Sequence, residues 1–368
     1  MKFTLSTKPF ANALDLGVVP KNVSKYYVKS CIAQLTATRD SLRINLEAAS
    51  ISTEIILRGS GDTDETVTRF VDCLVLKNLV GTLESSTVTI EYTDGGIILH
   101  SGTSKFSLVK TTEEGEMELA RPELADNASP SIKIDASDWK FISDHQMYAI
   151  AMSFVHPVYT YVWVGQSGDV IVGDFDNSLF TFSKKNKLGQ TCLLNDTIVN
   201  LFNSLPEGAT LTQLNEGYRI DVKTDGFEYA AQFKPKHEED EGVGSYNSQM
   251  ILSMLEVDDS TSSIKVPVAA ISKFLSQADL LSSRTDDSVE LSLSGNELKL
   301  KDENIDCKIT VEGNAGEFSA LFETALLKSV LGNVDQDFVS MVPMIQEGVT
   351  VGIIVKTDNM SVVLGSRE

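Results

Sequence analysis

Histidines and cysteines are the side chains most able to hold a metal or act as a nucleophile, and in this 368-residue chain their spacing favours neither role. The cysteines fall singly, with no CxxC pair, and no HExxH, GxSxG or GxxxxGK[ST] motif occurs. We therefore predict no catalytic residue, no metal, no cofactor and no enzymatic activity. The residues concerned are His100, His145, His156, His237, Cys31, Cys73, Cys192 and Cys307.

An acidic run, HEEDE, spans residues 237–241. Such a run could bind calcium or mimic DNA, but it lacks the alternating oxygen ligands and the glycine of a calcium loop. We interpret it as a solvated loop.

Charge and composition limit the class of protein. The chain has 52 acidic against 31 basic residues, a net charge of −21, so any contact with DNA must use a local patch. With 42% hydrophobic and 23% charged residues it is typical of a soluble globular protein. The opening MKFTLSTKPFANALDLG has no signal-peptide pattern. Together with the scattered cysteines, this predicts a cytoplasmic protein without a membrane partner.

One pattern recurs three times: a helix, then strand, turn, strand, turn, strand. The copies begin at Cys73, at Asn195 and near Ala320, the last with a helix over LFETALLKSVLGN. A further helix is predicted ahead of each copy, over residues 6–17, 137–153 and 266–283. We therefore predict six half-units.

The half-units pair into three domains separated by polar, acidic connectors at Thr111–Ser131 and Lys234–Ser248. The predicted domains are 1–125, 126–250 and 251–368. Two helices against antiparallel sheets in each domain give an α+β fold. Unpaired strands at the two ends of such a series favour closure into a ring by another copy.

At this point the sequence resembles the bacterial-type DNA sliding clamp, the β subunit of replicative DNA polymerases. The stretch VLKNLVGTLESSTVTIEYTDGGIILHSGTSKFSLVK at 75–110 is similar to the second half of a clamp's first domain. The opening MKFTLSTKPFANAL, the hairpin GDVIVGDFDNSLFTFS and the ending MSVVLGSRE also resemble clamp segments. Residue-by-residue similarity is confined to these segments, so the chain resembles a diverged clamp. We expect that it could be encoded by a phage.

The resemblance implies a homodimeric ring of six domains that encircles double-stranded DNA, lined by helices. Seven basic and eight acidic residues fall in the predicted helical segments, so those segments are nearly neutral while the rest is acidic. That balance suits a loose, sliding contact. The alternative for each basic residue is a solvated surface position. The expected DNA contacts are Lys8, Lys21, Lys25, Arg69, Lys77, Lys140, Tyr159, Tyr161, Lys184, Lys185, Lys187, Lys273, Arg284 and Lys328, of which Lys8, Arg69, Lys77, Lys140, Lys273, Arg284 and Lys328 are placed on helices.

The resemblance also implies two protein contact sites, each with ordinary core packing as the alternative. An apolar cleft would hold a peptide of the DNA polymerase or of an ATP-dependent clamp loader. Its expected residues are Val162, Ser178, Leu179, Met250, Ile251, Val362, Val363 and Leu364. The expected subunit interface contains Phe106, Leu108, Leu280 and Leu281. A β-rich structural or assembly protein, such as a virion component, is the competing function.

Overall fold

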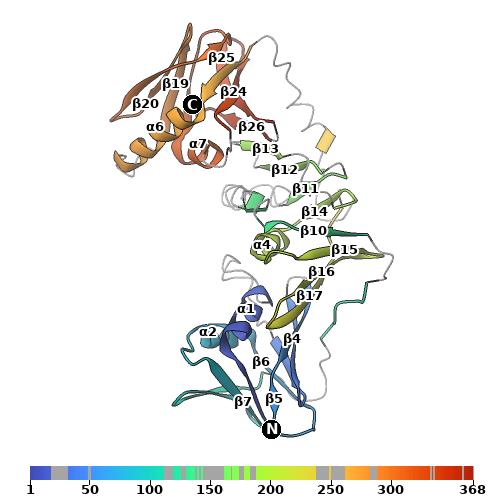
Figure 1. Cartoon of the computed structure of the whole chain (residues 1–368). Coiled ribbons are helices and arrows are strands. Elements are labelled where there is room, and N and C mark those ends of the chain that lie inside the picture. Colours follow the sequence, from blue (N-terminus) through green and yellow to red (C-terminus); the bar gives the residue numbers. More distant parts are fainter. Residues whose placement is uncertain are drawn as a thin grey trace. The chain divides into compact units, whose positions relative to one another are not determined.

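The computed structural model divides into two compact units (Figure 1). Unit 1 comprises Met1–Lys140 with Thr197–Pro235, and unit 2 comprises Phe141–Asp196 with Lys236–Glu368. The structure describes residues 1–17, 32–48, 51–111, 119–125, 130–136, 139–140, 142–143, 161–166, 168–173, 178–182, 188–237, 248–249, 262–281, 288–331, 334, 336–358 and 360–367.

Unit 1 contains two sheets whose described strand pairs are all antiparallel. Sheet A runs in the order β5 (Ser60–Gly61), β1 (Lys2–Ser6), β7 (Thr87–Thr93), β8 (Gly96–Ser101), β9 (Ser104–Val109). Sheet B runs in the order β10 (Ser131–Lys133), β15 (Thr210–Leu214), β16 (Gly217–Lys223), β17 (Phe227–Phe233), β4 (Ile51–Arg58), β3 (Ser41–Ala48), β2 (Ile32–Ala37), β6 (Val67–Asp72). The β17–β4 pair therefore joins the middle third of the chain to the first.

Alternating burial explains how sheet B forms its core. Along β4 the residues from Ile51 to Leu57 alternate between buried and partly exposed, the period expected of a strand with one face in the interior. The helices α1 (Thr7–Gly17), α2 (Cys73–Gly81) and α4 (Asp196–Ser204) belong to the same unit. Phe202 of α4 contacts Trp139 and Phe233 edge to face, at centroid distances of 4.7 and 5.7 Å.

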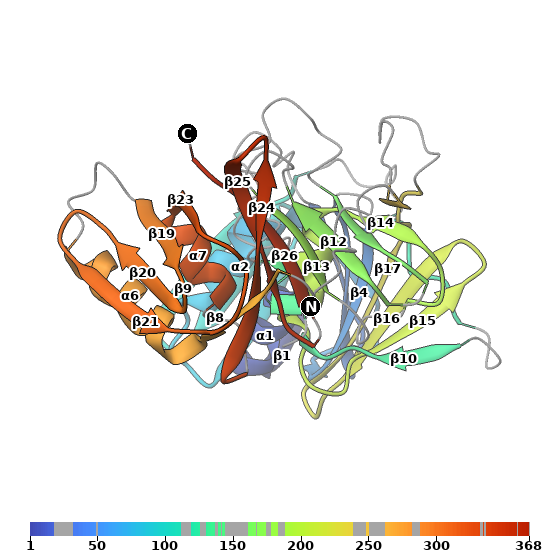
Figure 2. The same ribbon diagram turned by 90° about the horizontal axis from the view of Figure 1, so that it is seen from above.

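Unit 2 also contains two antiparallel sheets, in which distant segments become neighbours. Sheet C runs in the order β14 (Cys192–Leu194), β11 (Val162–Val164), β12 (Val170–Gly173), β13 (Ser178–Phe182), β26 (Met360–Gly365), β25 (Val349–Lys356), β24 (Phe338–Gln346), β18 (Ile264–Pro267), β22 (Glu312–Gly313). Sheet D runs in the order β21 (Asp306–Thr310), β20 (Glu297–Lys301), β19 (Ser288–Ser294), β23 (Phe318–Glu323). Figure 2 shows the sheet C strands β12, β13, β26 and β24 near one another.

Two helices of unit 2, α6 (Val268–Leu281) and α7 (Thr324–Leu331), pack against each other. The hairpin between β24 and β25 turns through Glu347 and Gly348, whose φ angles are 52° and 83°. Two consecutive positive φ values are typical of the tight hairpin turns that match the twist of the strands.

The strands and turns of the three predicted copies are confirmed, and the α+β class with mostly antiparallel sheets is confirmed as well. The helix expected near Ala320 is wrong at its start, because Phe318, Ala320 and Phe322 are buried alternately on the strand β23 and the helix begins only at Thr324. Of the helix predicted over 137–153, only residues 139–140 and 142–143 are described. The division into three domains stays a prediction.

Candidate functional site

Lysines lie on both of the paired helices α1 and α2 of unit 1, and Lys8 is the exposed one of the two. Lys8 is exposed on α1, and Lys77 of α2 reaches across to Asp15 of α1 with a distance of 3.1 Å between Nζ and Oδ1. The Lys77 side chain is 15% exposed, whereas Asp15 is 65% exposed. Lys77 therefore links the two helices while Lys8 keeps its charge in solvent.

The paired helices of unit 2 carry lysines in the same way. Lys273 of α6 and Lys328 of α7 are both exposed, and the two helices contact each other. The opposite sides of these helices are buried, as Phe274, Leu275, Leu327 and Leu331 show. Each helix is therefore held by an apolar face and presents a basic side chain to solvent, an arrangement able to meet phosphates.

The prediction that Arg69 lies on a helix is wrong, because Arg69 lies on the strand β6. It lies opposite Leu35 of β2, the strand with which β6 pairs antiparallel. The guanidinium donates from Nε to the Thr93 carbonyl at 2.5 Å and from Nη1 to the Thr68 carbonyl at 2.7 Å. With its side chain 15% exposed, Arg69 connects sheet B to the β7–β8 turn.

The remaining DNA candidates have mixed outcomes. Lys140 is exposed, and Tyr161 is partly buried with the Lys236 ammonium 5.3 Å from its ring centroid. The predicted contacts at Lys21, Lys25, Tyr159, Lys184, Lys185, Lys187 and Arg284 lie outside the described residues, as do the cleft positions Met250 and Ile251.

Two of the predicted cleft segments, far apart in sequence, lie side by side. Strand β13 pairs with the tail strand β26, so that Ser178 is opposite Leu364 and Leu179 is opposite Val363. Val162 lies on β11 in the same sheet. Val162, Val362 and Leu364 are fully buried, whereas Val363 is partly exposed. Among Val162, Val362, Val363 and Leu364, Val363 is the one whose side chain is partly in solvent, where a ligand could contact it.

A groove of about 710 Å³ lies beside the end of the tail in unit 2. Its apolar wall contains Leu321, Val349 and Val351, which are 39%, 65% and 39% exposed. Large apolar side chains left in solvent at one place indicate a contact surface. The other lining residues are Glu290, Ser319, Ala320, Thr350, Ser366 and Arg367.

The end of the chain forms one rim of this groove. Ser366 donates its backbone N–H to the Val351 carbonyl at 2.9 Å, and Arg367 donates its own to the Leu321 carbonyl at 2.8 Å. The Arg367 guanidinium also pairs with Glu323 at 3.1 Å. These bonds tie the tail to β25 of sheet C and to β23 of sheet D, so the groove has a fixed rim.

Sequence reasoning missed the groove residues Leu321, Val349 and Val351. The available signal was alternation: along β25, Val349 and Val351 share one face with period two while Thr350 faces the other. That pattern indicates which residues share a face, but it does not say that the face is left uncovered.

The predicted interface residues lie on an edge strand of sheet A and at the end of helix α6. Strand β9, which carries Phe106 and Leu108, is an edge of sheet A among the described strands. Phe106 is partly exposed and Leu108 is buried. Leu280 near the end of α6 is 84% exposed, and Leu281 is the last residue of that helix. An edge strand has unpaired backbone groups that can bind another strand.

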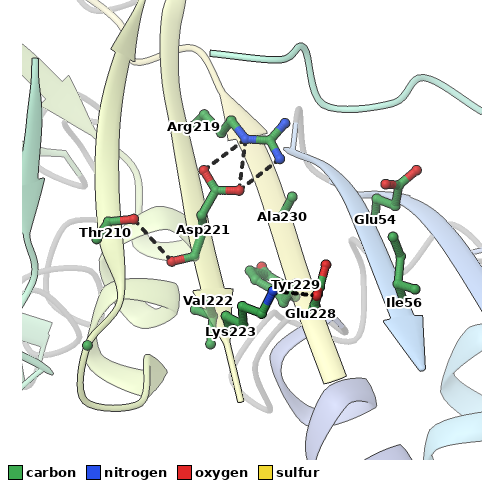
Figure 3. Close-up of a pocket in the computed structure, with 11 residues that line it drawn as sticks. Glu54, Ile56, Thr210, Arg219, Asp221, Val222, Lys223, Glu228, Tyr229 and Ala230 are labelled. Carbon is green, nitrogen blue, oxygen red and sulfur yellow. Dashed lines mark hydrogen bonds and ion pairs between the residues drawn. The ribbon is translucent and has the colours of Figure 1, made fainter. Parts of the chain in front are cut away.

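A polar hollow of about 340 Å³ lies on the outer face of sheet B in unit 1 (Figure 3). Ala230, between Asp221 and Glu54 in the register, leaves the space because its side chain is small. The charged groups around it are largely paired: Arg219 with Asp221 at 2.8 Å and Lys223 with Glu228 at 2.9 Å. This hollow therefore has little free charge to offer a ligand.

Solved structures provide the decisive comparison. A protein named as a DNA polymerase III beta subunit, from Eubacterium rectale, matches with a TM-score of 0.76 and 13% identity, over 100% of this chain and 99% of its own. Caulobacter crescentus pol III beta matches with a TM-score of 0.72 and 15% identity, over 100% of both chains. This chain has the DNA polymerase III β sliding clamp fold.

A DnaN sliding clamp from Bartonella birtlesii, solved bound to griselimycin, also has the clamp fold of this chain, with a TM-score of 0.73, 12% identity and full coverage of both chains. No family model matches the sequence, and no curated protein does. The clamp fold thus persists where sequence similarity is low. Within the described residues, no helix is long and apolar enough to cross a bilayer.

Proposed function

We propose that this protein is a DNA sliding clamp, a processivity factor that encircles duplex DNA and tethers a DNA polymerase. The observation that carries the proposal is the match to sliding clamps over the entire chain, at TM-scores of 0.70 to 0.76. In this role the protein acts by topology and needs no catalytic residue. The proposal includes a ring of two chains with three domains each.

The charge distribution supports a loose contact with DNA. The total charge of −21 makes the acidic surface repel phosphates, and Lys8, Lys273 and Lys328 are exposed on helices. Few basic contacts give weak binding that slides, because each phosphate contact adds to affinity and to its salt dependence. We place these lysines in the ring lumen.

The tail region supports partner binding. We propose that a short peptide of the polymerase, or of an ATP-dependent clamp loader, binds at the tail strand β26 and in the groove beside it. The peptide would anchor apolar side chains against Leu321, Val349 and Val351, which are exposed. A few buried apolar anchors account for most of the affinity in such contacts.

Ring closure would use the edge strand β9. We propose that this strand and Leu280 of α6 meet the corresponding surfaces of a second copy. Strand pairing across the boundary would satisfy the backbone groups of the edge, and Leu280 would lose its exposure of 84%. A covered edge removes a route to aggregation.

Light scattering of the purified protein tests the ring. We expect a mass of twice 40.1 kDa at micromolar concentration. A mass of one chain under these conditions would contradict a stable closed dimer. That result would favour the alternative function, a structural or assembly protein.

A further inference from the structure

Strand β23 is an edge of sheet D among the described strands, and part of it lines the groove beside the tail. The Leu321 carbonyl on this strand accepts the Arg367 N–H at 2.8 Å, and the two residues form an isolated antiparallel bridge. The free side of β23 therefore already accepts a main-chain hydrogen bond from one extended residue, as the edge of a sheet does when a strand is added to it.

The backbone of Ser319 continues this open edge. Along an antiparallel pair, residues that bond to the partner strand alternate with residues whose N–H and C=O point away from it. Leu321 directs its carbonyl away from β19, toward Arg367. Ser319 is exposed and lies two residues earlier in unbroken register, so its N–H and C=O point the same way. An extended peptide can therefore pair with Ser319.

Glu290 of β19 places a carboxylate beside that position. It lies opposite Leu321, and its Oε1 accepts a hydrogen bond from the Ser319 hydroxyl at 2.9 Å. A residue paired with Ser319 would have its side chain on the same face of the sheet, with its Cβ about 5 Å from that of Ser319. A lysine or arginine side chain at that position is long enough to reach the Glu290 carboxylate.

The charge of Glu290 is not balanced by a cation of the described chain. No described residue forms an ion pair with it, although Lys301 is its cross-strand partner on β20. Arg367, the other charged residue in the groove lining, pairs with Glu323 at 3.1 Å. The groove therefore combines its apolar wall with one carboxylate that is available to a cationic ligand.

We propose that the groove binds an extended peptide as a strand added to β23, and that Glu290 selects peptides with a lysine or arginine opposite Ser319. This inference rests on the proposed binding of a polymerase or clamp-loader peptide in the groove, and it adds which peptides are preferred. The strand edge supplies main-chain bonds that any sequence can make, whereas the carboxylate discriminates by charge.

Three peptides test this preference on the full-length protein: acetyl-Gly-Leu-Leu-Xaa-Leu-Leu-Gly-amide, with lysine, norleucine or glutamate as Xaa. Calorimetric titration at low salt measures their affinities for the parent protein, for Glu290→Gln and for the matched control Glu297→Gln. The control changes the total charge equally on the same face of sheet D, but Glu297 pairs with Lys308 and does not line the groove.

We expect the lysine peptide to bind the parent protein and the control about fivefold more tightly than the norleucine peptide, and the glutamate peptide to bind most weakly. The advantage of lysine should disappear in Glu290→Gln. This variant retains a side-chain oxygen that can accept the Ser319 hydroxyl, so it keeps the hydrogen bond between the two strands.

Equal affinity of the lysine and norleucine peptides for the parent protein would overturn the inference but leave the groove as a peptide site. An advantage of lysine that persists in Glu290→Gln would also overturn it, because the net charge of −21 would then account for the attraction. Absence of binding by all three peptides at millimolar concentration would contradict the proposed peptide site itself, and the inference with it.

Discussion

Leu179 of β13 lies directly opposite Val363 of β26, so the end of the chain is a central strand of sheet C and not an appendage. On its other side β26 pairs with β25, where Ile354 is opposite Val363. Removing β26 would leave the facing edges of β13 and β25 unpaired and would take the buried side chains of Val362 and Leu364 out of the core.

Two truncations should therefore have different effects. We expect deletion from Met360 onward to unfold unit 2, because a central strand with fully buried side chains is lost. Deletion of the last three residues alone should leave unit 2 folded. Thermal unfolding by circular dichroism distinguishes the two outcomes, and equal stability of both truncations would contradict the role given to β26.

Val351→Glu should weaken binding in the groove. A carboxylate placed beside Leu321 and Val349 puts charge on an apolar wall, so we expect at least tenfold weaker binding of the proposed polymerase or clamp-loader peptide. Calorimetric titration measures the affinity. The control is Phe338→Glu, an exposed apolar residue of β24 that does not line the groove. Equal losses in both variants would argue against the groove as the site.

Lys273→Glu/Lys328→Glu should reduce retention on DNA. If these lysines meet phosphates, the variant should dissociate faster, and the salt dependence of its affinity should fall by about two phosphate contacts. The matched control, Lys265→Glu/Lys301→Glu, changes the total charge equally at exposed positions on β18 and β20. A similar loss in the control would assign the effect to overall charge.

Gly96→Ala should weaken the edge of sheet A. Gly96 has φ of 138°, and a Cβ there would lie 2.2 Å from the Leu108 carbonyl oxygen on β9. We expect a loss of about 2 kcal/mol in unfolding free energy, together with a weaker dimer. Gly95→Ala provides the control, because a Cβ at Gly95 meets nothing within 4 Å. Denaturant titration and light scattering read out the two effects.

Acid should weaken the contact between β7 and β8. His100 Nε2 lies 2.7 Å from Glu91 Oε2, and this hydrogen bond, with Lys2 and Lys105, lowers the pKa of Glu91 below its ordinary 4.5 although partial burial opposes it. Because the pKa of the Glu91 carboxyl is lower in the folded than in the unfolded protein, its charge stabilises the fold at any pH above the unfolded-state pKa. This stabilisation is lost as the pH falls through the folded-state pKa.

The variant Glu91→Gln should therefore have a lower unfolding free energy than the parent protein at pH 7. The difference in unfolding free energy between the two should become smaller below pH 4.5. Unfolding measured across this pH range checks the sign. A difference that stays constant with pH would show that Glu91 contributes through packing and not through its charge.

The repeated order of helix and hairpins was predictable because alternation and turn residues are local signals. β16 and β17, for example, follow directly from YRIDVK and FEYAAQF. Arg69 was misplaced because a single basic residue among apolar ones suits either period, and its strand is decided by pairing with β2. The groove could not be predicted, since it depends on which distant strands meet.

Retention on end-blocked DNA tests the ring most directly, without need of a loader. The protein is mixed with linear duplex so that rings can thread over the ends, and the ends are then capped with biotin and streptavidin or left open. We predict that washing removes the protein from open DNA but leaves it on capped DNA. Equal loss from both would contradict encirclement.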